Sequence, residues 1–166
     1  MGERVRSKRS QETDMSQELS SYVDELAELL RQDEGFSATM YQDTEQIWTI
    51  GYGYNLEEGI SRAAAEFLLR EKMIEGFQEL DRHKPFWRVL PRPAKMVVGS
   101  MQYNLGWPRF SQFKKFWKAL EAHDYLGAAE EMIDSRWYRQ VKERGERLVS
   151  LMQSVAIQPT ESVKMG

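Results

Sequence analysis

Two carboxylic acids stand where they can act as an acid–base pair. Glu34 closes a predicted helix, and Asp43 lies in or beside a predicted β-turn nine positions later. Glycosidic-bond hydrolysis needs such a pair, because one protonated carboxyl donates to the leaving oxygen while an ionised one activates water or stabilises positive charge on the sugar. The hydroxyl of Thr49, on the next predicted strand, can hold that water. The chain has 26 acidic residues, so many carboxylate pairs share this spacing by chance. The alternative is that the three residues have only structural roles, as a helix-end glutamate, a turn-forming aspartate and a strand-forming threonine.

The composition narrows the chemistry to carboxylates. The sequence contains no cysteine, which excludes disulfide scaffolds, thiolate nucleophiles and cysteine-based zinc sites. The two histidines, His83 and His123, are forty residues apart, which argues against a histidine-rich metal site and a histidine-based triad. We therefore expect neither a metal nor a cofactor.

Length and charge indicate a globular protein of one domain, or of two small lobes. The 166 residues are 41% hydrophobic and 30% charged, with a net charge of −3. Residues 21–75 are acidic and residues 76–166 are basic on balance, but basic and acidic side chains alternate and no basic stripe appears. Without a basic stripe, we expect no nucleic-acid partner. No long apolar window or apolar N-terminal stretch is present, so we expect no membrane insertion and no secretory signal.

The elements that would position the pair follow from hydrophobic spacing. Residues 1–20 are polar, and we expect a disordered tail there. An amphipathic helix is predicted from 21 to 34, capped by Ser20 or Ser21 and stopped by Gly35. Residues 36–54 predict a β-hairpin that continues into a third short strand, with its turn at 42–46.

The remainder of the chain predicts helices. A long helix runs over 61–83, with Ser61 as its cap and Pro85 beyond its end. Four more are predicted over 93–105, 111–122 with Ser111 as cap, 124–134 with Asp124 as cap, and 142–154, with an irregular stretch at 135–138. The fold class is therefore α+β: a small hairpin lobe (21–60), a connecting helix (61–83), a larger all-helical lobe (84–156) and a C-terminal tail (157–166).

The sequence around the two carboxylates resembles the phage-type lysozyme family (glycoside hydrolase family 24). Glu34-Gly, Tyr41-Gln-Asp43 and Thr49-Ile-Gly-Tyr-Gly53 match the family's motifs at its intervals. Downstream matches extend the resemblance over residues 22–154; they are Ser100-Met-Gln-Tyr-Asn-Leu-Gly106, Asp124-Tyr-Leu-Gly-Ala-Ala129, Ser135-Arg-Trp-Tyr138 and Arg144-Gly-Glu-Arg147. One departure is Tyr54, where the family usually has histidine, and we expect an altered local hydrogen bond there.

The resemblance implies a lysozyme-like fold and a role for each matched residue. Glu34 is then the general acid, Asp43 the base that activates water, and Thr49 the residue that holds this water, in a reaction that inverts the anomeric carbon. Arg144 matches the arginine that pairs with the acid. Tyr103 and Asn104 match positions lining the sugar groove; the alternative role for Asn104 is to hold Trp137 by its ring N–H.

The resemblance also implies a function: an endolysin that cleaves the β-1,4 bond between N-acetylmuramic acid and N-acetylglucosamine in peptidoglycan and so lyses the cell. We expect a monomer that accumulates in the host cytoplasm and reaches the wall through a membrane pore. Two alternatives stay open: a lytic transglycosylase, which uses one glutamate and no water, and a non-catalytic wall-binding or tail module.

Overall fold

The computed structural model describes residues 3–157, with side chains from residue 17 onward. The chain divides into two compact units, at residues 62 and 63. Among the described residues, no helix has both the length and the apolar content needed to cross a membrane. The predicted C-terminal tail lies almost wholly outside the described residues.

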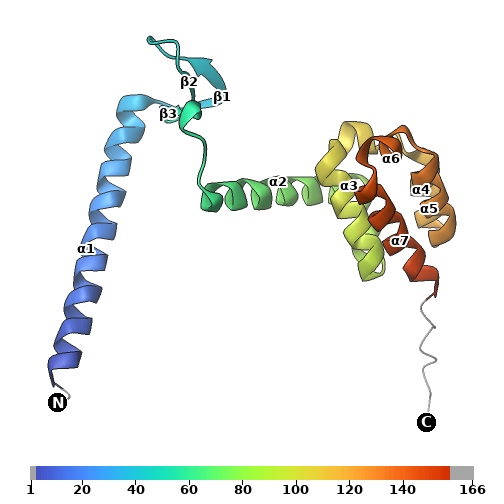
Figure 1. Ribbon diagram of the computed structural model, residues 1–166, viewed down its shortest axis with the longest axis horizontal. Coiled ribbons are helices and arrows are strands. Elements are labelled where there is room, and N and C mark those ends of the chain that lie inside the picture. The colour runs from blue at the N-terminus through green and yellow to red at the C-terminus, as the bar shows by residue number, and fades with distance from the viewer. Residues whose placement is uncertain (1–2, 158–166) are drawn as a thin grey trace. The chain divides into compact units, whose positions relative to one another are not determined.

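The first unit contains one helix and a small sheet (Figure 1). Helix α1 (Glu3–Glu34) is followed by strands β1 (Ser37–Gln42), β2 (Trp48–Gly51) and β3 (Tyr54–Asn55), then a 3-10 turn η1 (Leu56–Glu58). The strands are antiparallel in the order β1-β2-β3. Thr49 at the centre of the sheet faces Tyr41 on one side and Asn55 on the other. The predicted hairpin with a third short strand is confirmed.

The start of α1 differs from the prediction. The helix begins at Glu3 rather than after Ser20 or Ser21, so residues 3–20 extend it. No glycine or proline occurs between Glu3 and Glu34, and most side chains before Ser20 are good or neutral helix formers. A serine that can cap a helix does not interrupt one, and this is why the predicted start was wrong.

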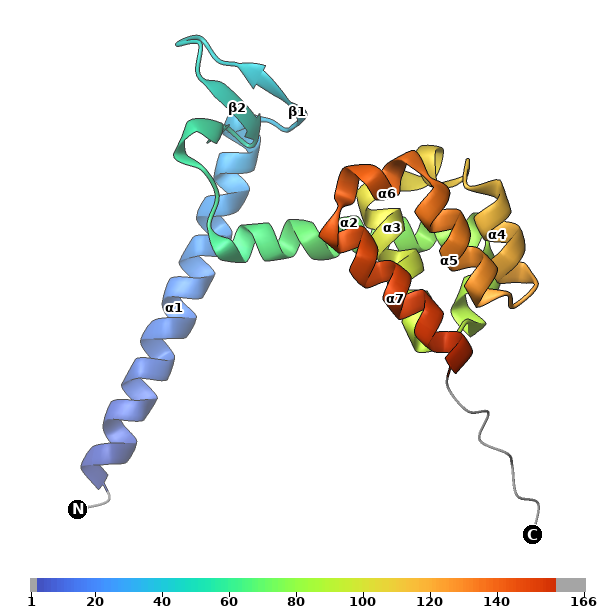
Figure 2. The same cartoon turned by 45° about the vertical axis from the view of Figure 1, so that its right-hand side comes forward.

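The second unit is helical. It comprises α2 (Arg62–His83), the 3-10 turn η2 (Pro85–Val89), α3 (Arg92–Phe110), α4 (Lys114–Glu121), α5 (Tyr125–Asp134), α6 (Arg136–Val141) and α7 (Glu143–Ile157). Helix α7 packs against α3 and α5, and α4 packs against α5 (Figure 2). The core of this unit is apolar, and its largest fully buried side chains include Phe110, Phe116, Leu80, Met101, Leu120 and Met132. Each of these contributes roughly 1.5–3 kcal/mol by leaving water.

Helix caps confirm part of the prediction and correct the rest. Asp124 caps α5, because its Oδ1 accepts a hydrogen bond from the Gly127 N–H at 2.8 Å. Ser111 does not cap α4; it ends α3, and its hydroxyl donates to the Pro108 carbonyl. The stretch expected to be irregular is the start of α6, which Ser135 caps by accepting from the Tyr138 N–H. The α+β class, with a small antiparallel sheet in a mostly helical chain, is confirmed.

Candidate active site

Glu34 is placed by the end of α1. It is the last residue of the helix, and Gly35 follows with a φ of 67°, a left-handed conformation that glycine adopts without strain. This turn leads directly into β1. The predicted position of Glu34 at a helix end before a hairpin is therefore confirmed.

The Glu34 carboxylate lies against the backbone of the turn between β2 and β3. A Cβ atom added to Gly53 would lie only 2.8 Å from Glu34 Oε2, and Gly53 itself has a φ of 75°. The backbone conformation therefore favours glycine at this position, and a Cβ there would oblige the carboxylate to move. The contact joins the end of α1 to the sheet within the first unit.

Asp43 is held by its own turn. Its Oδ1 accepts hydrogen bonds from the backbone N–H groups of Glu45 and Ile47, both at 2.9 Å. Its backbone N–H donates to the Ile47 carbonyl at 3.0 Å. These bonds form an Asx-type turn that fixes the carboxylate. Among the described residues, nothing is hydrogen-bonded to Oδ2, which is left for another partner.

Thr49 lies on the same face of the hairpin as Asp43. The register pairs Tyr41 with Thr49 and Gln42 with Trp48, and the next facing pair is Asp43 and Ile47. Thr49 is only 3% exposed, and its hydroxyl donates to the Ile47 carbonyl at 3.1 Å. The hydroxyl proton is thus in use, but the oxygen still has acceptor capacity for a water.

A small pocket of about 320 Å³ opens beside Glu34. It is lined by Glu34, Gly35, Phe36, Ser37 and Tyr41. The pocket places Glu34 beside Tyr41, the register partner of Thr49, whereas Asp43 does not line it. The rings of Phe36 and Tyr52 lie 5.3 Å apart and are both substantially exposed, which adds an apolar surface on this unit.

Tyr54, the residue that departs from the family pattern, makes a hydrogen bond of its own. Its hydroxyl donates to the Gly59 carbonyl, and its backbone pairs with Ile50 across β2 and β3. This bond ties the short β3 strand to the end of η1. The local hydrogen bond is thus one that the tyrosine hydroxyl supplies.

The other three predicted site residues belong to the helical unit. Tyr103 on α3 is 37% exposed, with Lys72 Nζ 6.0 Å from its ring centre. Arg144 is exposed on the first turn of α7 and has no ion pair among the described residues. Its pairing with Glu34 stays a prediction.

Asn104 positions a tryptophan. Its Oδ1 accepts a hydrogen bond from Trp137 Nε1 at 2.8 Å, across 33 residues of sequence. Trp137 is 4% exposed, so this buried N–H needs such an acceptor. The structural alternative for Asn104 is confirmed, and its contact with sugar stays a prediction.

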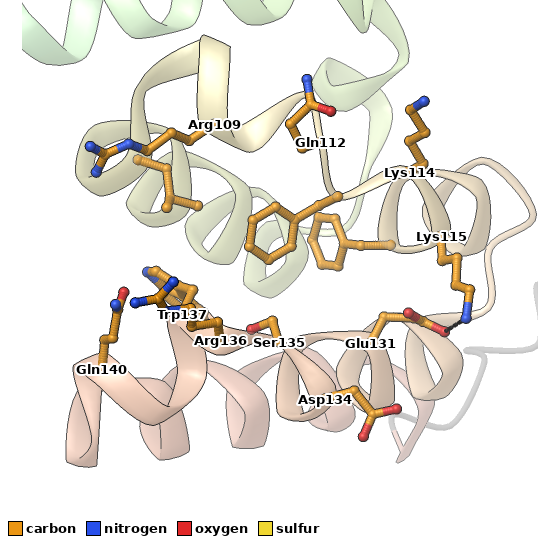
Figure 3. A pocket seen from close by; sticks show the side chains of 13 residues that line it. Arg109, Gln112, Lys114, Lys115, Glu131, Asp134, Ser135, Arg136, Trp137 and Gln140 are labelled. Atoms are coloured by element: carbon orange, nitrogen blue, oxygen red, sulfur yellow. Dashed lines mark ion pairs between the residues drawn. The ribbon is translucent and has the colours of Figure 1, made fainter.

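Trp137 in turn forms a wall of a pocket of the helical unit, about 580 Å³ in volume. Figure 3 shows Arg109 and Gln112 on one side of this pocket and Trp137, Arg136 and Gln140 on the other. Lys115 and Glu131 pair at 3.9 Å at one end. The sequence did not single out this pocket, because its walls come from four successive helices, α3 to α6, whose packing no local pattern encodes.

The strongest electrostatic feature of the helical unit is structural. The Arg88 guanidinium, and then the Trp87 ring N–H, hydrogen-bond the Asp81 carboxylate and lower its pKa. Burial raises the pKa of Tyr125. Neither residue lies in the pockets described above, and the Asp81 cluster ties the end of α2 to η2.

Comparison with known proteins places the chain among enzymes. A family model described as phage lysozyme matches residues 31–154. Probable T4-type lysozymes 1 and 2 of Dictyostelium discoideum are each 25% identical over 162 residues, covering 80% of this chain and 95% of each relative. The pre-baseplate central spike protein Gp5 of Enterobacteria phage T4 is 24% identical over 156 residues, covering 76% of this chain and 27% of that protein. The segment matched by the family model contains all six predicted site residues.

Proposed function

The chain belongs to the phage lysozyme family, which consists of glycoside hydrolases, and from this premise we propose that it hydrolyses the β-1,4 bond between N-acetylmuramic acid and N-acetylglucosamine in peptidoglycan. The observation that carries the proposal is the position of Glu34. It lies in the matched segment, at the mouth of a pocket and at the family's intervals from Asp43 and Thr49.

In the proposed mechanism Glu34 protonates the leaving sugar oxygen. Asp43 activates a water molecule, and the Asp43 Oδ2 atom, which has no hydrogen bond among the described residues, is the suitable acceptor for the water proton. The acceptor capacity of the Thr49 hydroxyl supports its role in holding this water. A water between the two carboxyls leads to inversion, for which the carboxyls are roughly 6.5–9.5 Å apart.

Mass spectrometry of digested peptidoglycan tests the reaction, with Glu34→Gln as the control. We expect fragments that end in reducing muramic acid from the wild type and none from the variant. Fragments ending in anhydro-muramic acid, lighter by one water, would replace the proposal with a transglycosylase. A folded wild type that releases nothing would leave a wall-binding module. Proton NMR of the first product then reads the stereochemistry, because inversion of a β-bond releases the α-anomer first.

The pairing of Arg144 with Glu34 is a second part of the proposal. An arginine beside the acid would orient its carboxyl through a charge-assisted hydrogen bond. We expect Arg144→Ala to lower kcat/KM on peptidoglycan, and Arg144→Lys to restore part of the loss. An unchanged kcat/KM in Arg144→Ala would remove the pairing.

We also propose that the enzyme acts in lysis of a bacterial host, accumulating in the cytoplasm and reaching the wall through a membrane pore. Two relatives named as lysozymes match over 95% of their own length, which supports a free enzyme over a segment of a baseplate spike. Expression in bacteria with and without a pore-forming protein tests this. We expect culture turbidity to fall only when the pore is present, and lysis without it would refute the proposed route.

A further inference from the structure

A buried amide in the helical unit has no partner for its oxygen. Gln102 on α3 is 4% exposed, and its Oε1 makes no hydrogen bond with any described residue. Buried polar atoms are nearly always paired, because leaving one without a partner forfeits the hydrogen bond it had with water. The Gln102 oxygen therefore has acceptor capacity that none of the described residues uses.

Gln102 lines a pocket of about 450 Å³ between α2 and α3. Opposite it stands Gly76, where an added Cβ would lie 3.1 Å from Gln102 Cγ. A side chain at position 76 would thus require Gln102 to shift by a few tenths of an ångström. Rotation about the last bond of Gln102, which is a soft torsion, turns Oε1 towards the pocket that the same side chain lines.

The rest of the pocket favours a sugar. The Glu75 carboxylate supplies acceptors for hydroxyl groups, and Lys72, which also lines the pocket, supplies a donor. The Glu79 carboxylate is already paired with Arg82 and His83. The Tyr103 ring supplies an apolar face, and the Trp107 ring, stacked on His83, adds to the aromatic wall. A pocket with a few polar groups among aromatic walls is typical of a small-ligand site.

We propose that Gln102 is a specificity-determining residue that accepts a hydrogen bond from the acetamido N–H of an N-acetylhexosamine bound between α2 and α3. This rests on the proposed function, since the polymer named there carries an acetamido group on each sugar. Tyr103, predicted from the sequence to border the sugar groove, lines the same pocket. The pocket then selects the acetamido group and not merely the ring.

Binding of two trisaccharides tests the proposal without cleavage. The probes are tri-N-acetylchitotriose and cellotriose, which differ at C2 by an acetamido group against a hydroxyl. Affinities are measured by calorimetry for Glu34→Gln alone and combined with Gln102→Leu. We expect Gln102→Leu to weaken chitotriose binding by about 3- to 10-fold, the value of one hydrogen bond, and to leave cellotriose binding unchanged. The side-chain amide resonance of Gln102 should shift only with chitotriose.

Gln153→Leu is the matched control, since it makes the same substitution at a half-buried position on α7 outside the pockets described. Equal losses for both sugars, no loss for either, or no chitotriose binding at all would overturn the proposal. Leucine removes the unpaired oxygen, so thermal melting should show a fold at least as stable as the parent. Because Glu34→Gln does not cleave, these outcomes are independent of whether the wild type hydrolyses peptidoglycan.

Discussion

Replacing Gly53 by alanine tests whether the backbone of the β2–β3 turn positions the proposed acid. The new Cβ would lie 2.8 Å from Glu34 Oε2, whereas ordinary contact begins at 3.4 Å, so the carboxylate must retreat by about 0.6 Å. A misplacement of 1 Å in a catalytic group costs roughly 10²-fold in rate. We therefore expect kcat on peptidoglycan to fall by about 10- to 20-fold.

The same substitution also strains the backbone, and this effect needs its own control. A non-glycine residue in the left-handed region costs about 1–2 kcal/mol, which lowers the Tm of a protein of this size by about 2–8 °C. Gly51→Ala is the matched variant, because Gly51 has a φ of 69° and open space around its Cβ position. We expect both variants to lose similar thermal stability but only Gly53→Ala to lose most of its kcat. Equal kcat in the two variants would refute the positioning argument.

Three further predictions concern other contacts. Asp43→Asn keeps an oxygen that can accept from the turn's N–H groups. We therefore expect a Tm within about 2 °C of wild type, as for a typical surface substitution, together with loss of fragment release from peptidoglycan. A retained rate of release would exclude Asp43 as the base. Asn104→Ala leaves the Trp137 N–H unpaired, and we expect a loss of about 1–3 kcal/mol in urea unfolding, which should vanish when Trp137 is already phenylalanine. Asp81 has a pKa held below its ordinary 3.8 by Arg88, so its ionised form stabilises the fold above that pH and the benefit is lost as the pH falls through the folded-state value; the Tm gap between wild type and Asp81→Asn should therefore close on acidification, and a constant gap would contradict the assignment.

The local elements of the first unit were predictable because short-range signals specify them. Gly35 ends α1, and the polar segment after Gln42 forms the turn between β1 and β2. The start of α1 was not predictable from Ser20, because capping preference competes poorly with a run of helix formers.

Contacts between residues that are distant in sequence could not be predicted from residue patterns. The approach of Glu34 to Gly53 depends on how a helix end meets a turn, and no local preference encodes that distance. The Gln102 site had a signal, since it stands four residues after Val98 and directly after Met101 on the buried stripe of α3. A polar residue at such a position is worth marking, because burial demands a partner for it.

The Asx turn at Asp43 determines which substitutions its loop tolerates. The bonds that hold Asp43 come from main-chain groups of its own loop, so they survive changes of side chain at Thr44 and Glu45. A library randomised at these two positions should return many active clones, whereas insertions there should return few. Gln46, which carries a φ of 66°, should drift towards glycine or asparagine, the residues that accept that conformation most readily. The loop that carries the proposed catalytic base can therefore keep its backbone conformation while the side chains at positions 44 and 45 change.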